Sequence, residues 1–406
     1  MSTPRDALSR RALLGMMAAS GLMPLLPRNR LLPAFAPAGR APGDRRLLLL
    51  YLEGGNDGLN TVVPHEDPLY HDARPRLALS GTDLPRLDDL TALHPALAPW
   101  ERLHDEGQLA VLRDVGMHEP DRSHFVARDI VHAGRLPEAE RTQGWVGRAL
   151  DASGTASGAL PGLALGALES PLILKGPRRT GLTLDTLETL AVPGGPSGAM
   201  PDLAALAAGR NAAPLSTRVG HVAQDAYALS DQIERMVERV PAGDGYPDSA
   251  LGDRLRLAAR LVRADDGPTT LWTSLGGFDT HAVQSGTHTA LLMQLAAATS
   301  AFVDDLARDG THRRTLVLVY SEFGRRVKEN GSGGTDHGAA GPMFALGGSV
   351  KGGLHGPPSD LERLQDGDVR ARVDFRSVFS EVATRWMGWD AEALFGPVED
   401  GPGFVG

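Results

Sequence analysis

Runs of consecutive apolar residues, each ending abruptly in polar residues and glycine, recur along the chain. They lie at Arg45–Leu52, Leu109–Val115, Thr269–Ser274 and Leu316–Tyr320, with a shorter run at Met343–Leu346. Because apolar residues follow one another without alternation, the four longer runs predict strands that are buried on both faces, as in a parallel sheet. The shorter run predicts a further edge or core strand.

Segments with the helical period separate these strands. Helices are predicted for Pro95–Gln108, a segment ending near His132, Gly144–Asp151, Thr217–Val240, Ser249–Ala264, His288–Arg308 and Asp374–Met387. Alternating strands and helices predict an α/β fold, with a mostly parallel sheet covered by helices on both faces. We expect residues 39–406 to form one domain, in which the Gly/Ala/Leu/Pro-rich residues 153–200 form an inserted lobe or lid.

Polar side chains gather where the predicted strands end. In sheets of this kind the carboxyl ends of parallel strands share one edge, and ligands bind there. We therefore expect one site that collects side chains from distant segments, namely Asp57, Ser123, Asp279, His281, Glu322, Arg325, Asp336 and His337.

Three of these positions allow two interpretations each. The residues around Asp57 form either a tight turn or part of a site. Asp279 and His281, two apart in an extended segment, point to the same face. They are either two ligands of one metal or an acid that orients an imidazole. Ser123 is either an ordinary N-cap or a nucleophile at a helix N-terminus, and His118 and His124 beside it are ligands, bases or surface residues.

Composition narrows the chemistry of this site. The 406 residues include no cysteine, which excludes thiolate metal sites, iron–sulfur clusters and cysteine nucleophiles. A metal must then be held by histidine, carboxylate, hydroxyl or water, which favours Zn²⁺, with Mn²⁺, Mg²⁺ or Ca²⁺ as alternatives. The hydrophobic content of 42% supports a large core, and the net charge of −9 argues against nucleic acid as a partner.

The first 38 residues have the pattern of an export signal. Ser9-Arg10-Arg11 precedes an apolar stretch that is interrupted by Gly15, Pro24 and other small or polar residues, and A-x-A sequences follow up to residue 38. The paired arginines predict export of the folded chain by the twin-arginine translocase. We expect a periplasmic or extracellular protein whose mature chain has no stable membrane span.

Seven short motifs occur in the order expected of one bacterial exported family. They are LEGGNDGLNTVVP, RSHF, GWVGR, GGFDTH, SEFGR, ENGSGGTDHG and VKGG. In these motifs the chain resembles the domain of unknown function 1501 family (DUF1501), which is similar to the alkaline phosphatase and sulfatase superfamily. The resemblance implies a three-layer α/β/α sandwich, a divalent metal site and a nucleophile at a helix N-terminus.

Carried over by position, the resemblance assigns roles to single residues. Asp57 and Glu322 look like metal-binding acids, and Ser123 looks like the nucleophile. Asp279 with His281 looks like a ligand pair, and His337 looks like the last histidine ligand. Glu322-Phe323 stands where the superfamily often has Asp-His. Since phenylalanine cannot bind a metal, a single-metal site or a site without catalysis is implied as an alternative to a two-metal site.

Two classes of function follow. The first is an exported metal-dependent hydrolase of a small phosphate or sulfate ester, with Ser123 as nucleophile and Arg325 or Arg122 holding the transferred anion. The second is an exported binding or assembly protein that keeps the fold without turnover. The glutamate–phenylalanine sequence favours the second class, whereas the retained nucleophile and ligands favour the first.

Overall fold

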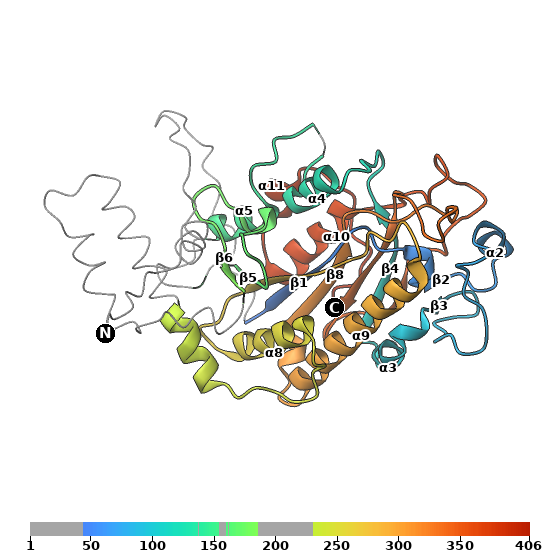
Figure 1. Cartoon of the computed structure of the whole chain (residues 1–406). Helices are drawn as coiled ribbons and strands as arrows, with labels where there is room; N and C mark the ends of the chain where they lie inside the picture. The colour runs from blue at the N-terminus through green and yellow to red at the C-terminus, as the bar shows by residue number, and fades with distance from the viewer. Residues whose placement is uncertain (1–43, 137, 154–159, 161, 186–229) are drawn as a thin grey trace, which may run out of the picture.

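One large sheet forms the centre of the protein, whose computed structural model describes residues 44–136, 138–153, 160, 162–185 and 230–406. Its strand order is β10 (Gly353–His355), β4 (Leu109–Gly116), β9 (Gly341–Leu346), β8 (Thr315–Ser321), β1 (Arg46–Glu53), β7 (Thr270–Gly276), β5 (Leu163–Leu165) and β6 (Leu182–Leu184); β11 (Val373–Asp374) also pairs with β4 (Figure 1). Among the described strands of this sheet, only β9 is antiparallel to its neighbours, which are β4 and β8. The predicted mostly parallel α/β sheet is confirmed.

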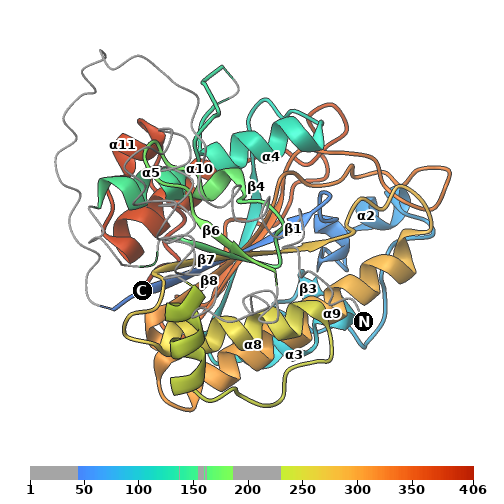
Figure 2. The ribbon, with the colours of Figure 1, turned by 60° about the vertical axis from the view of Figure 1, so that its left-hand side comes forward.

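Helices cover both faces of this sheet, so the three-layer arrangement is also confirmed. One face carries α3 (Pro99–Asp105), α8 (Ala250–Arg263) and α9 (Gln284–Ala307), and the other carries α4 (His124–Ala133), α5 (Trp145–Ala152), α10 (Phe375–Glu381) and α11 (Ala391–Phe395) (Figures 1 and 2). Smaller elements are α2 (Pro68–Ala73), a two-stranded sheet of β2 (Val62–Val63) and β3 (Ala92–Leu93), and the short helices η1 (Gly58–Asn60), η2 (Pro95–Leu97), η3 (Leu172–Leu174), η5 (Thr311–Arg314) and η6 (Val382–Met387).

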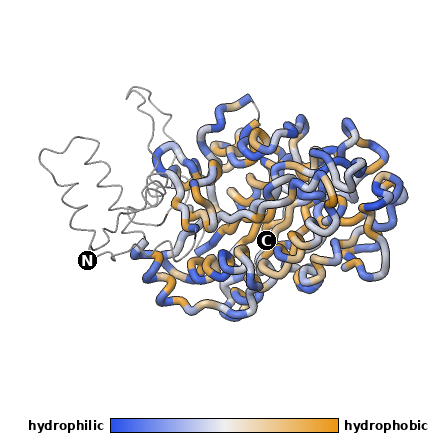
Figure 3. Tube along the Cα trace, in the orientation of Figure 1, coloured by the Kyte–Doolittle hydropathy of each residue, from blue (hydrophilic) through white to orange (hydrophobic). Residues whose placement is uncertain are grey.

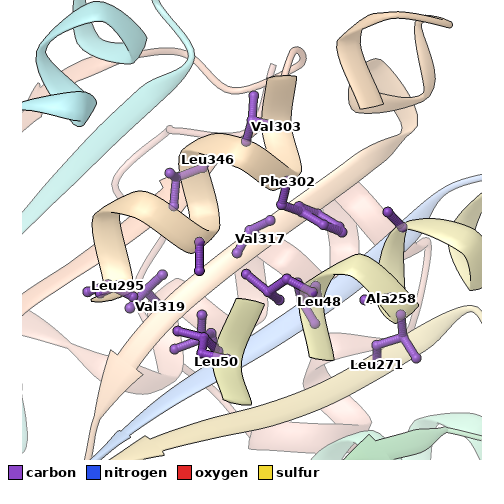
Figure 4. Close-up of a cluster of buried hydrophobic side chains, with 14 of the residues drawn as sticks. Leu48, Leu50, Ala258, Leu271, Leu295, Phe302, Val303, Val317, Val319 and Leu346 are labelled. Carbon is purple, nitrogen blue, oxygen red and sulfur yellow. The ribbon is translucent and has the colours of Figure 1, made fainter. Parts of the chain in front are cut away.

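The core divides at the sheet because successive side chains of a strand point to opposite faces. In β1, Leu48 and Leu50 pack with α8 and α9 (Figure 4). Leu47 and Leu49 pack with α4, α5 and α10 on the other face. All four are fully buried. Burial of each such side chain stabilises the fold by about 1.5–3 kcal/mol relative to exposure. Figure 3 shows the result, with hydrophobic positions along the sheet and hydrophilic ones on the outer loops.

The helix α9 is the long apolar helix on one face of the sheet. By length and composition it is the one helix in the described part of the chain that could cross a membrane. However, 61% of its most apolar window is buried within the protein, and Leu292 and Leu295 contribute to the core beneath β1. Its position on the sheet is that of a core helix.

Local sequence explains how several helices begin. Asp374 accepts a hydrogen bond from the backbone N–H of Arg376 at 2.8 Å, and Ser249 accepts one from Gly252 at 3.1 Å. These side chains satisfy N–H groups that have no partner within the first turn of α10 and α8.

The structure corrects two expectations about the fold. The helix predicted for residues 95–108 is divided into η2 and α3, since Pro99 has no N–H to donate and begins a new helix. The Gly-rich segment 350–356, expected as a turn, contains strand β10. Of the residues 153–200 that the structure describes, those in β5 and β6 belong to the central sheet. The predicted signal segment, residues 186–200 and residues 217–229 lie outside the described residues.

Candidate metal centre

Four strands deliver side chains to one edge of the sheet. Strands β1, β7 and β8 are parallel neighbours, and β4 runs in the same direction because the antiparallel β9 lies between β4 and β8. Asp279 and His281 follow β7, Glu322 and Arg325 follow β8, and the segment after β4 leads into α4. The carboxyl ends therefore meet, as the sequence predicts.

Glycine after β1 lets the strand-end loops approach closely. Gly54 has a φ of +116°, and a Cβ there would lie 2.4 Å from the backbone nitrogen of Asp279. Gly55 has a φ of +73°, and a Cβ there would lie 2.4 Å from the ring of Phe323. Only glycine fits both the backbone conformation and the space, so this pair sets how near Asp279 can come to the loop after β8.

The buried side chain of Arg325 connects the same loops. Its guanidinium donates to the carbonyl oxygens of Gly54, Gly55, Phe278 and Thr335. It also donates to Oδ1 of Asp279 at 2.6 Å, and the Arg325 side chain has no exposed surface. The sequence interpretation gave this residue the role of holding a transferred anion. In the structure its donors are directed to backbone carbonyls and Asp279, so its contacts are those of a positioning residue.

Three imidazoles surround the carboxylate of Asp279. Nε2 of His281 lies 3.0 Å from Asp279 Oδ1, and Nε2 of both His124 and His337 lies 3.2 Å from the same atom. One ligand atom each of His124, Asp279 and His337 lies within 4.8 Å of the others. We call His124, Asp279, His281 and His337 the histidine–aspartate cluster.

Each imidazole is held through its other nitrogen. Nδ1 of His124 lies 2.7 Å from Oε1 of Glu322, and Nδ1 of His281 lies 3.2 Å from Oδ1 of Asp336. Nδ1 of His337 lies 2.7 Å from the carbonyl oxygen of Arg122, which can only accept. These contacts place a proton on each Nδ1, so in the neutral rings every Nε2 offers a lone pair.

The cluster therefore brings lone pairs of nitrogen and oxygen atoms close together, with too few N–H groups to form hydrogen bonds between them. Nε2 of His281 and Nε2 of His337 are 2.8 Å apart, and the buried Nε2 of His124 faces Oδ1 of Asp279 at 3.2 Å without the geometry of a hydrogen bond. Ligand atoms of a tetrahedral Zn²⁺ site with nitrogen and oxygen donors lie about 3.3 Å apart, close to the spacings around Asp279. His124, Asp279 and His337 offer two imidazole nitrogens and one carboxylate oxygen within 4.8 Å of one another, a donor set that fits Zn²⁺, and His281 lies beside them against Asp279 and His337.

The supporting acids are held in their charged form. Burial acts to raise the pKa of Glu322, but the hydrogen bond from His124 and other donors lower it below its usual range. The hydrogen bond to Glu322 in turn raises the pKa of His124. Hydrogen bonds from Asn330 and His281 lower the pKa of Asp336. Glu322 and Asp336, expected as ligands, thus lie behind His124 and His281 and orient them.

Asp279 is also held as a carboxylate. Burial acts to raise its pKa, but the hydrogen bond from Arg325 and the positive charge of that guanidinium outweigh burial and keep the pKa well below the ordinary value. The negative charge is about half exposed, facing the three imidazoles. A cation at this point would meet one formal negative charge in the histidine–aspartate cluster.

Phe323 packs against two imidazoles of the cluster. Its ring centroid is 4.9 Å from that of His124 and 4.9 Å from that of His337. The side chain is buried and packs against the backbone of Gly55. Phe323 thus supports two of the imidazoles by contact, and it contributes no donor atom.

Ser123 lies at the N-terminus of α4, next to His124. It is exposed, has an extended backbone, and makes no side-chain cap hydrogen bond. The first turn of α4 also carries no acidic residue. The free N–H groups and the positive end of the helix dipole at such a position attract anions.

Asp57 lies in a different polar cluster. Its side chain is fully buried, and Oδ2 forms an ion pair with Arg74 at 2.6 Å and accepts a hydrogen bond from Gln284. Burial acts to raise the pKa of Asp57, but Arg74 lowers it below the ordinary value. This placement differs from the expectation of a ligand, since the hydrogen bonds of Asp57 go to Arg74, Gln284 and Thr61 and its charge is matched by Arg74.

From the sequence, His124 could be a ligand, a base or a surface residue. Its position directly after Ser123, where a helix begins beyond a buried strand, is the signal that could have placed it at the site. The two ring nitrogens of His355 lie near the carbonyl oxygens of Pro402 and Lys351, away from the cluster.

Comparison with known proteins gives one family and several distant structures. A family model described as "Protein of unknown function (DUF1501)" matches residues 113–403. No curated protein matches the chain.

Similar solved structures include a sulfatase, PsFucS1, from Pseudoalteromonas sp., with 13% identity over 99% of this chain and 76% of that chain and a TM-score of 0.41. The TAB5 alkaline phosphatase, as a Mg-bound variant, has 12% identity over 86% and 99% of the two chains and a TM-score of 0.38. The C-terminal periplasmic domain of EcEptC from Escherichia coli, in complex with Zn, has 11% identity over 87% and 84% and a TM-score of 0.38.

Proposed function

The chain belongs to the DUF1501 family, and from its histidine–aspartate cluster we propose that it is a metal-dependent hydrolase of a phosphate or sulfate ester. One observation carries the proposal. Three Nε2 atoms and one carboxylate oxygen converge, while every Nδ1 is held by an acceptor behind it. Such an arrangement supports binding of a divalent cation by neutral imidazoles.

His124, Asp279, His281 and His337 would hold this cation, with Zn²⁺ fitting the imidazole-rich set best. When bound, a divalent cation supplies Lewis-acid polarisation of a phosphoryl or sulfuryl oxygen and lowers the pKa of a nearby hydroxyl or water. The hard cations Mg²⁺ and Ca²⁺ prefer oxygen ligands, which makes them the weaker candidates at a site with three imidazoles.

The chain's own residues provide the nucleophile and the anion site. Ser123 is exposed beside His124, and the uncapped N-terminus of α4 offers N–H groups to the oxygens of the transferred group. Oγ of Ser123 attacks phosphorus or sulfur and releases its proton to solvent. The bond to the alcohol oxygen breaks, and the alcohol leaves with a proton from water. A water molecule then attacks the seryl ester, which releases phosphate or sulfate and restores Ser123.

Three further residues act through the cluster. Arg325 holds Asp279 against the loops after β1 and β7, Glu322 orients His124, and Asp336 orients His281. These contacts fix the side chains before substrate binds, which lowers the cost of reaching the reactive geometry. In the same proposal the protein is periplasmic or extracellular, exported through its paired arginines by the twin-arginine translocase.

Metal content and hydrolysis test the proposal together. Elemental mass spectrometry of the mature protein should find about one equivalent of a divalent metal, which His124→Ala and Asp279→Asn remove. Ser123→Ala should keep the metal and lose hydrolysis of p-nitrophenyl phosphate or sulfate, whereas Ser153→Ala, at the end of α5, should keep both.

Two outcomes would contradict the proposal in different places. If Ser123→Ala hydrolyses the ester at the wild-type rate, Ser123 is not the nucleophile. If the protein stays metal-free after incubation with Zn²⁺ and Mn²⁺, the ring nitrogens of the cluster bind protons and do not bind a metal cation. The second class of function, binding or assembly without turnover, would then be the better explanation of this fold.

A further inference from the structure

Two large apolar side chains stand in solvent next to the histidine–aspartate cluster. Phe125 follows His124 and is 72% exposed, and Val283 lies two residues after His281 and is 80% exposed. Most large apolar side chains of the described chain are buried in the core. Exposed apolar groups beside a polar site contribute to recognition when a ligand covers them.

These two side chains approach the site from opposite faces of the sheet. Phe125 lies in the first turn of α4, whose Ala127 and Ile130 pack on one face. Val283 precedes α9, whose Leu291 and Leu292 pack on the other face. Both helices begin at the carboxyl edge of the sheet, and Figure 2 shows them on its two sides. The cluster at that edge therefore has an apolar side chain on either side.

Val283 keeps its place at a conformational cost. Its φ of +47° and ψ of +43° lie in the left-handed region, which is unfavourable for a β-branched residue. Two backbone hydrogen bonds hold the segment: Val283 donates to the carbonyl of Ser332 at 3.1 Å, and Gln284 donates to that of Gly333 at 2.9 Å. Glycine would adopt this backbone freely, so the exposed valine is not required by the turn itself.

The position of Val283 is also fixed relative to the cluster. Ser332 and Gly333 belong to the loop that continues to Asp336 and His337, and Asn330 of this loop donates to the carbonyl oxygen of His281 at 2.9 Å. The backbone of Val283 is therefore hydrogen-bonded to the loop that carries Asp336 and His337. On the other side, the guanidinium of Arg128 lies 5.6 Å from the ring centre of Phe125.

We propose that Phe125 and Val283 form an apolar rim that contacts the alcohol part of the substrate, so that the substrate is an anionic ester of an alkyl or aryl alcohol. This inference rests on the proposed function, because the rim acts on whatever ester the cluster holds. The anionic group binds at the N-terminus of α4 and the cluster. The apolar alcohol contacts the rim, which removes apolar surface of the alcohol and of the two side chains from water.

A series of alkyl phosphates tests the rim. Methyl, ethyl, butyl and hexyl phosphate have leaving groups of nearly equal basicity, so differences among them report apolar contact more than bond breaking. The wild-type kcat/KM should rise roughly fourfold for each of the first methylene groups, the fold-change that corresponds to burying one methylene group. Phe125→Ala and Val283→Gly should each flatten this dependence on chain length. The same series of alkyl sulfates is run in parallel.

Met293→Ala is the matched control. Met293 is 57% exposed on α9 but lies ten residues, or about 15 Å of helix, beyond Val283, and its loss should leave the chain-length dependence unchanged. Binding of the matching alkylphosphonates, measured by calorimetry, provides a readout that needs no turnover.

These measurements separate the two proposals. Equal rates for all chain lengths in the wild type, or an unchanged dependence in Phe125→Ala and Val283→Gly, would overturn the rim while hydrolysis itself still supports the proposed function. Absence of hydrolysis with every ester, combined with phosphonate affinity that rises with chain length and falls in the two variants, would overturn the hydrolase and leave the rim. Phosphonate affinity that is independent of chain length would overturn the rim in either case.

Discussion

The two aspartates that follow β1 and β7 should respond oppositely to the same substitution. Asp57 forms a buried ion pair with Arg74, whereas Asp279 faces the three imidazoles. Asp57→Asn should therefore lower the stability of the protein and leave its metal content unchanged. Asp279→Asn should remove the metal and have the smaller effect on the stability of the metal-free protein.

The structure gives the size of the first effect. Both side chains of the Asp57–Arg74 pair have no exposed surface, and Arg74 also donates to Asn60 and to two backbone carbonyls. Removing one charge of such a pair leaves the other buried without its counter-charge, which costs about 3–5 kcal/mol. With an unfolding entropy of about 2.1 cal/mol/K per residue, this corresponds to a melting temperature lower by roughly 5 °C.

Thermal unfolding followed by circular dichroism, with elemental analysis of the same samples, provides the assay. Asp89→Asn, on an exposed loop, is the control for loss of one aspartate charge. The pH dependence adds a second check. Because the folded pKa of Asp57 is below its unfolded value, its contribution is present above about pH 4 and is lost as pH falls through the folded pKa. Asp57→Asn should lack this acid-dependent component.

The reasoning would be refuted by the reverse result. If Asp57→Asn lost the metal while its metal-free melting temperature stayed at the wild-type value, Asp57 would be a ligand and the ion pair with Arg74 would carry little stability.

Three further changes should give defined results. Glu322→Gln should weaken Zn²⁺ binding about 10–100-fold in a chelator competition, because it alters the acceptor that orients His124, and unchanged affinity would count against that role. Burial lowers the pKa of His288 to about 4, so as pH falls the imidazole is protonated in the unfolded chain before it is protonated in the folded protein, and the free energy of unfolding should fall by ~3 kcal/mol between pH 6.5 and pH 4. In urea unfolding, His288→Asn should lose less stability over this pH range, and an equal loss would refute the role of His288. Gly147→Ala should lower the melting temperature, since its Cβ would lie 2.3 Å from the backbone carbon of Lys175, and an unaltered temperature would show that this contact can relax.

The apolar pattern was sufficient to place the central strands and their direction. β1, β7 and β8 match the runs at Arg45–Leu52, Thr269–Ser274 and Leu316–Tyr320, because strands buried on both faces leave a continuous apolar signal. β10 and β6 have three residues each, and their side chains are largely half-buried, which leaves no such signal. Short edge strands are recognised from their pairing partners, and these are known only from the fold.

The site could be predicted as a location more accurately than as a set of contacts. Parallel topology alone brings Asp279, His281 and His337 to one edge of the sheet. For this reason the sequence was sufficient to predict that they share one site. It does not determine which acid binds directly and which one orients a histidine. That distinction depends on side-chain direction, as Glu322 shows by meeting Nδ1 of His124 from behind. The partner of Asp57 lies seventeen residues further on, directly after α2, and no local pattern marks Arg74 as that partner.

Arg325 connects the stability of the sheet with the geometry of the cluster. It binds carbonyl oxygens of the loops after β1 and β7 and, through Thr335, of the loop that leads to His337. The pairing of Glu53 with Gly276 sets the register of β1 against β7, and hence the distance between the carbonyls that Arg325 bridges. A shift in this register would move Asp279 away from the three imidazoles even if every side chain were kept. The donor set thus depends on backbone alignment, and the buried arginine resists its displacement because leaving any of its donors unpaired is costly.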